Sequence, residues 1–597
     1  MTKANPFIVH TPEQLTPENI AANFVEMYTD FPKLKEPVNM FIHGPRGAGK
    51  SIMLRSLENK VQLLLKKDGD NALPFFAIHV PIKRAFFGNP EFLRLTGWKA
   101  TTVGEHLLSI YAVQYLFEAF YENSLDLADE HKAEFVELWE DCGGKSDLGK
   151  LSKLTTFDDL AKFCEKEATR VRQYYVRLPN GNDPDIYGGA LTSFNDFVLP
   201  LCRILVSDLK LNENDPICFM IDDADNLPEA LQRVLNSWVS ARVAKTICIK
   251  VTTQLGYKTY RTVDGRIIES PHDFSEVNIG SVYTSNKGHF AKRIEAIVQK
   301  RLENAGITAS PEDFFPTDLE QLEKRDNIWS DLTSGKTKGH VALKGRGPSR
   351  NSDLAQRYTI PALMRKLSSS KSSHTYSYAG LQSLTDLSSG VVRWFLEPAG
   401  QMYHSIDSTL TKKPEAIPVS YQDSEITNWS REFREKLDVD PGHSDVVEKD
   451  SSLQSLGHSR KNYTKLGNLL DGIGWFCRER LLDETASEQR LFSFVLSDDP
   501  VEELTDILHL GVRMGYLQKS DLASKSALGG RRPRYILSRR LGPHYRLDVS
   551  GYAAHLSVKS SDLLIALRKP KSFVKIRLGL DGKNEDQSIM DLEVDDG

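Results

Sequence analysis

Short apolar runs alternate with helical patterns along the first half of this chain. Four runs rich in Ile, Val and Phe have the length of buried strands: 38–43, 75–82, 217–221 and 246–251. Between and after them, apolar residues recur at helical spacing, over 105–137 and again over 290–302. Strands that alternate with helices predict an α/β fold built on a parallel sheet.

The interval between the second and third strand runs is long. Residues from about 84 to 215 carry mostly helical patterns, with a loop rich in Gly, Asn, Asp and Pro at 179–189. We therefore predict one α/β domain over 1–305 that contains a large helical insertion.

The composition changes downstream of this domain. Gly, Ser and basic residues dominate 331–375, which predicts a mobile segment inside a helical lid region at 306–403. Residues 404–425 have the pattern of a linker. We predict a separate winged-helix-like domain at 420–575 and an acidic tail at 576–597.

Overall composition is that of a globular protein. The 597 residues carry a formal net charge of −5, so any binding of a polyanion requires a local basic surface. The six cysteines show no zinc-ligand spacing, which indicates reduced thiols in a cytoplasmic protein. The sequence has neither a hydrophobic signal core near Met1 nor a run of about 18 apolar residues, so no membrane span is expected.

The first strand run leads directly into a complete G-x-x-x-x-G-K-[ST] motif, and a helical pattern follows. In this setting the glycines let backbone N–H groups surround a phosphate, and the helix start adds its positive dipole end. Lys50 is predicted to reach the β- and γ-phosphates and Ser51 to ligate Mg²⁺. The alternative is a glycine-rich turn with a solvated lysine. The predicted cofactor-binding residues are Gly44, Pro45, Arg46, Gly47, Ala48, Gly49, Lys50, Ser51 and Ile52.

A pair of carboxylates follows the third strand run. Asp222 stands where a residue at the end of a buried strand holds Mg²⁺ opposite the loop serine, and Asp223 is predicted to polarise the attacking water. Many P-loop ATPases carry Glu at the second place. Because Asp reaches less far, slow or partner-dependent hydrolysis is expected. The alternative is an Asp-rich turn without a metal.

Two further side chains are candidates for contact with the γ-phosphate. Thr253 ends the fourth strand run, where a polar residue contacts the phosphate or the attacking water; the alternative is a threonine that bonds local backbone. Arg393 follows Gly390 at the start of a helical pattern and is predicted to contact the γ-phosphate from the lid; the alternative is a solvated arginine. No Asn-Lys-x-Asp guanine motif is present, which favours ATP over GTP.

The last third contains a helix followed by a basic hairpin pattern. The helix is predicted at 500–514, with Asp499 as its cap and Gly515 as its end. Two strand patterns around a Gly-Gly turn follow, as in the wing of a winged-helix domain. A solvated hairpin or a docking surface for an acidic protein is the alternative. Three arginines are predicted to project from the hairpin tip and to bind nucleic acid weakly: Arg531, Arg532 and Arg534.

Together these motifs resemble the AAA+ ATPases of the origin-recognition type, specifically the bacterial ORC-like branch found in antiphage defence loci. The resemblance rests on residues 44–55, 221–225, 250–254, 376–380 and 388–393. It implies a P-loop NTPase core, a helical lid and a winged-helix-like domain, with ATP and Mg²⁺ as cofactors. The Asp at the second acidic position and the long insertion depart from the family pattern, and the insertion argues against replication initiation and favours a specialised sensor or effector scaffold.

Three functions follow from these observations. The first is an ATP-driven molecular switch that self-associates or assembles with an effector subunit encoded nearby, in bacterial antiviral defence. The second is a DNA-binding initiator or remodelling ATPase that uses the winged-helix hairpin. The third is a scaffold that binds ATP structurally and hydrolyses little. No nuclease, deaminase or protease constellation accompanies the motifs.

Overall fold

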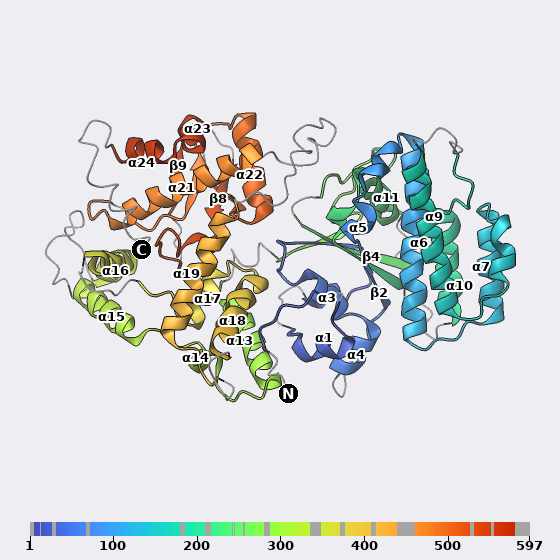
Figure 1. Cartoon of the computed structure of the whole chain (residues 1–597), viewed down its shortest axis with the longest axis horizontal. Helices are drawn as coiled ribbons and strands as arrows, with labels where there is room; N and C mark the ends of the chain where they lie inside the picture. The colour runs from blue at the N-terminus through green and yellow to red at the C-terminus, as the bar shows by residue number, and fades with distance from the viewer. Residues whose placement is uncertain are drawn as a thin grey trace. The chain divides into compact units, whose positions relative to one another are not determined.

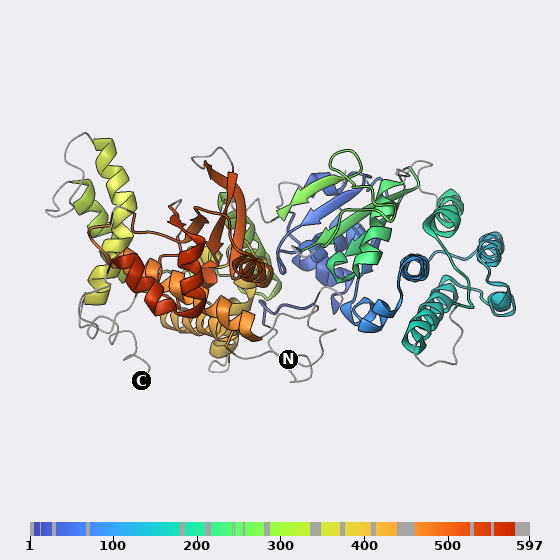
Figure 2. The same cartoon turned by 90° about the horizontal axis from the view of Figure 1, so that it is seen from above.

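The structure is a computed structural model. It describes residues 5–11, 14–26, 31–66, 72–178, 186–208, 216–241, 243, 245–254, 257–279, 287–334, 348–369, 376–407, 414–438, 460–486, 488–525, 531–550 and 554–579. The chain forms two compact units, one over Val9–Lys300 and one that joins Met1–Ile8 to Arg301–Gly597. Figures 1 and 2 show the elements of both units.

The Val9–Lys300 unit is built on a parallel five-stranded sheet of order β2-β3-β4-β1-β5. The four predicted strand runs are confirmed as β1 to β4. The fifth strand had no apolar run to predict it, because only Val277 of its four residues is buried. The strands are β1 Met40–His43, β2 Phe76–Pro81, β3 Ile217–Asp222, β4 Ile247–Thr253 and β5 Ser275–Asn278.

Both faces of this sheet are covered, so the central strands β3 and β4 are buried along their whole length. Alternate residues of β2 divide between the faces: Ile78 and Val80 pack with the helical insertion, whereas Ala77 packs with the helices that flank the phosphate loop. The helices outside the insertion are α1 Pro17–Asn23, α2 Phe31–Leu34, α3 Lys50–Arg55, α4 Asn59–Leu65, α11 Glu229–Ser240 and α13 Lys287–Asn304.

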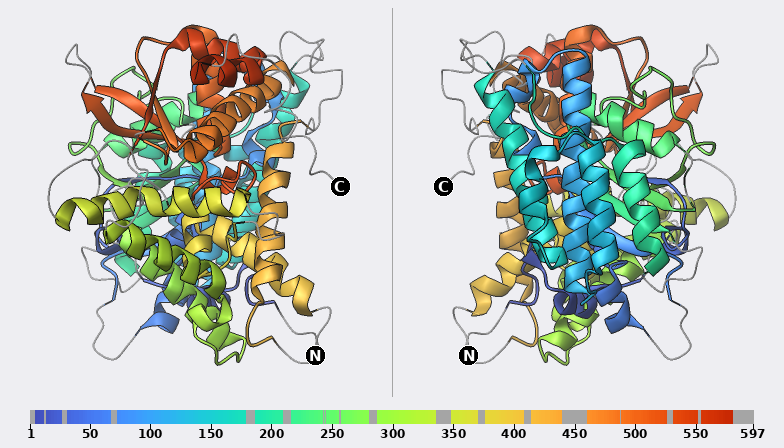
Figure 3. Two further views of the ribbon diagram at one scale, coloured as in Figure 1. Left: turned by 90° about the vertical axis from the view of Figure 1, so that its left-hand side faces the viewer. Right: turned by 90° about the vertical axis from the view of Figure 1, so that its right-hand side faces the viewer.

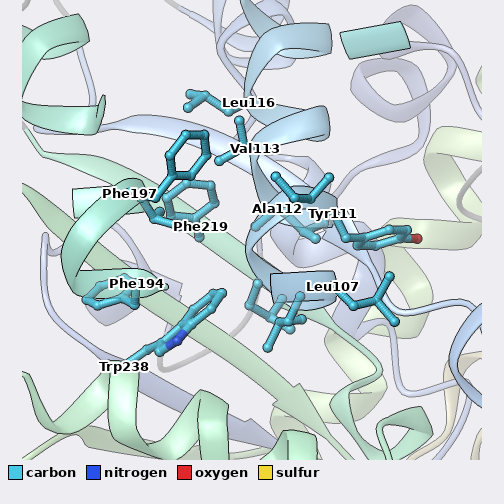
Figure 4. Packing of buried hydrophobic residues seen from close by; sticks show 14 of the residues in the cluster. Leu107, Tyr111, Ala112, Val113, Leu116, Phe194, Phe197, Phe219 and Trp238 are labelled. Atoms are coloured by element: carbon cyan, nitrogen blue, oxygen red, sulfur yellow. The ribbon is translucent and has the colours of Figure 1, made fainter. Parts of the chain in front are cut away.

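The segment between β2 and β3 is helical, as its pattern indicates. Its helices α6 and α9 lie side by side in Figures 1 and 3. In Figure 4, Leu107 and Leu116 of α6 face the same core as Phe219 of β3, where Phe194 stacks on Trp238 with ring centroids 5.0 Å apart. The insertion's α-helices are α5 Arg84–Phe87, α6 Trp98–Glu122, α7 Asp129–Asp141, α8 Leu148–Leu151, α9 Phe157–Arg177 and α10 Leu199–Asp208.

The second unit combines helices with a mixed four-stranded sheet of order β7-β8-β6-β9. Its strands are β6 Ser493–Leu496, β7 Leu517–Lys525, β8 Arg531–Leu537 and β9 Leu556–Val558. Its helices are α14 Pro311–Phe314, α15 Leu319–Thr333, α16 Pro348–Ser369, α17 Leu381–Leu387, α18 Val392–Asp407, α19 Val419–Glu435, α21 Arg460–Leu482, α22 Glu502–Met514, α23 Ser560–Arg568 and α24 Pro570–Leu578. None of the described helices in the chain is long and apolar enough to cross a membrane.

The prediction of a mobile segment over 331–375 is wrong for α16. Ala355, Thr359 and Leu363 recur every four residues and are buried, so one face of this helix packs against the unit's core. Polar residues at its exposed positions, such as Ser352, Arg357 and Lys366, conceal that stripe in the sequence. The rest of the segment belongs to α15 up to Thr333 or lies outside the described residues, at 335–347 and 370–375.

Three predicted boundaries in this unit also differ. The predicted linker at 404–425 contains the end of α18 and the start of α19, and the predicted acidic tail begins inside α24. Helix α22 ends at Gly515, as predicted, in the left-handed conformation, but Val501 rather than Asp499 precedes its first residue. The backbone carbonyl of Asp499 instead accepts a hydrogen bond from Ser560 Oγ at 3.3 Å.

Candidate nucleotide-binding site

The predicted phosphate loop joins β1 to α3. Gly47 and Gly49 have φ angles of 86° and 99°, which disfavour any residue with a side chain. The amide of Gly44 donates to the carbonyl of Thr253 at 3.3 Å, so the loop starts from the end of the neighbouring strand β4. The helix then begins at Lys50, directly after the left-handed Gly49.

Lys50 is buried inside this loop. Its Nζ donates to the carbonyl oxygens of Gly44 at 2.8 Å and Pro45 at 3.1 Å. Burial lowers the pKa of Lys50, and the nearby carboxylates of Asp223 and Asp222 oppose that shift. The ammonium therefore lies between the loop and the acidic pair, where it is able to neutralise phosphate charge.

Asp222, the last residue of β3, is held by several donors. Its Oδ2 lies 3.1 Å from Nε2 of His79, and its Oδ1 accepts hydrogen bonds from the Thr252 hydroxyl and from the Asp223 amide at 3.1 Å. Burial alone raises its pKa, but the hydrogen bonds from His79, Thr252 and Ser51 prevail and lower the pKa to about 2. The structure thus brings the hydroxyl of Ser51 next to the ionised carboxylate of Asp222.

Asp223 has the opposite environment. Burial, reinforced by the charge of Asp222, raises the pKa of Asp223 above its ordinary value. Its backbone is left-handed, with φ of 55°, and its Oδ1 accepts a hydrogen bond from Nε2 of Gln254 at 3.3 Å. Asp225, two residues further along the chain, accepts a hydrogen bond from the backbone amide of Gln254. The two acids of the predicted pair therefore differ in the direction of their pKa shifts and in their hydrogen-bond partners.

The strand-end threonines are both buried and engaged. Thr252 Oγ1 donates to Asp222 and accepts the Asp223 amide at 2.8 Å. Thr253 Oγ1 lies 2.5 Å from Nδ1 of His43, whose Nε2 lies 3.2 Å from Glu276. Thr253 thus joins the site through His43, and its contact with the γ-phosphate stays a prediction.

Three polar residues of this site were not predicted from the sequence: His43, His79 and Gln254. His79 interrupts an apolar strand run and His43 ends another, and a polar residue at such a position requires a hydrogen-bond partner. These two positions were the signal that the sequence offered. Gln254 directly follows β4, one residue beyond the threonine that was selected.

The hydroxyl of Ser51 and the carboxylate of Asp222 are hard oxygen ligands of the kind that Mg²⁺ prefers. Among the described residues, no group of three or more His, Cys, Asp and Glu is arranged to hold a metal ion. Two protein ligands fit an ion that is held mainly by nucleotide phosphates and water. The residues present therefore fit a Mg²⁺–nucleotide complex better than a free metal ion.

The remaining candidate residues belong to the other unit. Arg393 lies in the first turn of α18, after Ser389 and Gly390, which both have positive φ. Its contact with the γ-phosphate stays a prediction.

The predicted hairpin is present as the antiparallel pair β7–β8, although its turn and the Arg531 side chain lie outside the described residues. Arg532 does not project freely from a tip. Its Nη1 donates to the carbonyl of Leu496 in β6 at 3.1 Å, and only 24% of its side chain is exposed. Arg534 is half-buried and pairs with Ser520. The prediction of three solvent-directed arginines is therefore wrong for Arg532, because the sheet itself supplies an acceptor.

Comparison with known proteins agrees with this geometry. A family model described as ORC-CDC6-like matches residues 5–558, which includes the sheet, the phosphate loop, the acidic pair and the second sheet. No curated protein matches the chain. The parallel sheet with a phosphate loop after β1 and an acidic pair after β3 is consistent with the AAA+ architecture of that family. This chain belongs to the ORC-CDC6-like family of AAA+ ATPases.

Proposed function

We propose that this chain binds and hydrolyses ATP with Mg²⁺ and acts as a molecular switch. The observation that carries the proposal is the convergence of Lys50, Ser51 and Asp222 at the ends of two strands that are far apart in sequence. A lysine for the phosphates, a hydroxyl for the metal and an ionised carboxylate opposite it are the parts that phosphoryl transfer requires.

Within this site each residue has a proposed task. The loop amides and Lys50 bind the phosphates, while Ser51 and Asp222 hold the ion through oxygen atoms. Asp223 orients the attacking water, and Gln254 holds Asp223 in place through the hydrogen bond at 3.3 Å. When bound, Mg²⁺ supplies charge neutralisation at the phosphates.

Loss of ATP binding in the Lys50→Ala variant is the primary test. Removing one partner of a buried charge pair costs about 2 kcal/mol or more, so affinity should fall about 30-fold or more by titration calorimetry. The exposed Lys153 provides the matched control, since Lys153→Ala removes the same charge from the segment between α8 and α9. If Lys50→Ala binds ATP as tightly as the wild type, the proposal fails.

The switch is proposed to be cytoplasmic and to assemble with further copies or with an effector subunit, in bacterial antiviral defence. This part rests on the resemblance to the ORC-like branch of defence loci and on the absence of other catalytic motifs in the sequence. Expression in a bacterial host under phage challenge tests it. Protection by the wild type that is lost in Lys50→Ala supports the role; equal survival with and without the chain contradicts it.

A second candidate, DNA binding by the β7–β8 hairpin, is favoured by the antiparallel pair that directly follows α22. Replacing Arg531, Arg532 and Arg534 together with Ala should weaken duplex binding and flatten the slope of log K against log salt, because fewer counterions are released. Because Arg532 also binds Leu496, an Arg531→Ala, Arg534→Ala double variant separates loss of charge from damage to the sheet. Equal binding by wild type and double variant would instead favour a protein-docking hairpin.

The third candidate, an ATP-bound scaffold, is favoured by the short Asp223 and by its engagement with Gln254. Single-turnover hydrolysis by the wild type separates it from the switch. Retention of intact ATP over many hours would support the scaffold.

A further inference from the structure

His79 is a mostly buried polar residue, and within the described part of the chain its side chain is hydrogen-bonded to Asp222. It lies on β2, at the edge of the parallel sheet, and its side chain is 10% exposed. Strand register pairs Pro81 with Asp222, so His79 lies two residues back on the same face of the sheet. Its Nε2 is 3.1 Å from Asp222 Oδ2 across the β2–β3 pair.

The hydrogen bonds to Asp222 are divided between its two oxygens. The Thr252 hydroxyl and the Asp223 amide donate to Oδ1, His79 is hydrogen-bonded to Oδ2, and the Ser51 hydroxyl also donates to this carboxylate. An ionised carboxylate only accepts hydrogen bonds, so Nε2 of His79 carries the proton in this contact. With donors on both oxygens, rotation of the carboxylate about its last side-chain bond is restricted.

His79 also forms part of a polar groove of about 240 Å³. The groove is bounded by the end of α3 with the start of α4, by β2, and by the last turns of α6. Glu122 and Asn123 line it from α6. His79 is hydrogen-bonded to Asp222, whereas Asn123 of the same groove donates to the carbonyl of Ala119, so Asn123 serves as a matched control.

We propose that His79 is a positioning residue for the metal-binding carboxylate, and that its Nε2–H holds Oδ2 of Asp222 in the orientation that binds Mg²⁺ opposite Ser51. This inference deepens the proposed ATPase function and rests on it. His79 touches neither nucleotide nor metal; it acts through Asp222. Groups that orient metal ligands in this way typically contribute about 10- to 100-fold to metal affinity.

The test measures Mg²⁺ dependence of nucleotide binding, not turnover. A fluorescent ATP analogue is titrated with EDTA present and then across a range of Mg²⁺ concentrations. For His79→Ala we expect the half-saturating Mg²⁺ concentration to rise about tenfold, at the lower end of the range for such groups, because Thr252 still holds Oδ1. Binding in EDTA should stay within about twofold of the wild type, since the phosphate loop is untouched.

Conservative variants separate positioning from packing. In His79→Gln the amide nitrogen replaces Nε2 and should restore most of the Mg²⁺ affinity, whereas in His79→Asn the shorter amide replaces Nδ1 and should not. If His79→Ala fails to fold, the comparison of His79→Gln with His79→Asn still tests the positioning role. Asn123→Ala, a change in the same groove, should leave the Mg²⁺ curve unchanged.

The outcomes distinguish the inference from the proposed function. If Mg²⁺ strengthens binding equally in the wild type and in every His79 variant, the positioning role is overturned and the ATPase proposal stands. An equal loss of nucleotide affinity in EDTA and in Mg²⁺ would show that His79 supports the phosphate loop. That result would also overturn the positioning role. If the wild type itself binds no nucleotide, the proposed function fails and the inference fails with it.

Discussion

The two carboxylates after β3 have pKa values that are pushed apart. The pKa of Asp222 is lowered to about 2 by its hydrogen-bond donors in spite of burial. Burial and the charge of Asp222 raise the pKa of Asp223. Such separation is the usual sign of different chemical roles for neighbouring acids. The lowered pKa of Asp222 fits its proposed role as a metal ligand, and the raised pKa of Asp223 fits its proposed role as the acceptor of a proton.

Substitution of each acid should therefore have a different effect. We expect Asp223→Asn to keep ATP bound and to slow hydrolysis about 10²- to 10⁴-fold, the usual contribution of a general base. Asp222→Asn should instead remove the part of binding that depends on Mg²⁺. Rapid-quench assays with γ-³²P-labelled ATP measure the rate of hydrolysis, and a parallel titration measures the Mg²⁺-dependent binding. Wild-type turnover in Asp223→Asn would assign the water to another residue.

At the scale of elements, the helical insertion contains a buried polar network. His106 of α6 is fully buried, with its Nε2 3.3 Å from Glu167 of α9 and its Nδ1 2.9 Å from Thr192. Arg170 and Tyr187 also donate to Glu167. The network joins α6 through His106, α9 through Glu167 and Arg170, and the segment after α9 through Tyr187 and Thr192. It therefore fixes how α6 and α9 pack.

This network predicts a pH dependence of stability. Burial lowers the pKa of His106, with Glu167 opposing, so the folded state binds the proton less readily than the unfolded chain. Stability is therefore fully present above about pH 6.5, the unfolded pKa, and is lost as the pH falls below it, by at most about 1.4 kcal/mol per pH unit. Calorimetric unfolding between pH 8 and 5.5 should show a shallower loss for His106→Gln. Identical pH slopes would contradict the assignment.

The apolar contacts of α6 make a separate prediction. Leu116 is completely buried where α6 meets the sheet (Figure 4), so Leu116→Ala leaves a cavity and should cost about 2–5 kcal/mol. Leu63→Ala is the control, because Leu63 on α4 is 72% exposed and its truncation should change stability by less than about 0.5 kcal/mol. Urea unfolding of both variants compares the two costs. Equal costs would mean that the insertion does not stabilise the unit.

At the scale of the whole molecule, the phosphate loop and Arg393 belong to different units. A charge-assisted contact with the γ-phosphate exists with ATP and is lost with ADP, so it is able to shift the equilibrium between two arrangements. Small-angle scattering should therefore differ between ADP and a non-hydrolysable ATP analogue. Arg393→Ala should abolish that difference, whereas Arg431→Ala, which removes a half-exposed helix arginine of α19, should keep it. Identical scattering with both nucleotides would contradict a nucleotide-driven rearrangement.

The sequence by itself determined the parts that depend on local pattern. The phosphate loop, the four apolar strands and the acidic pair were found because each is a short contiguous segment whose residues must have a given polarity or backbone freedom. The helical character of the long insertion was also local information. The end of α22 at Gly515 followed from the same kind of signal.

Only the tertiary structure decided which of these segments meet. The strand β5 and the helix α16 are stabilised by neighbours rather than by their own composition, so their sequences did not reveal them. His79 and Asp222 are separated by 143 residues and become partners because β2 lies beside β3 in the sheet. A hydrogen bond of that kind depends on strand order, which is set by the packing of the whole unit and by no single segment of the chain.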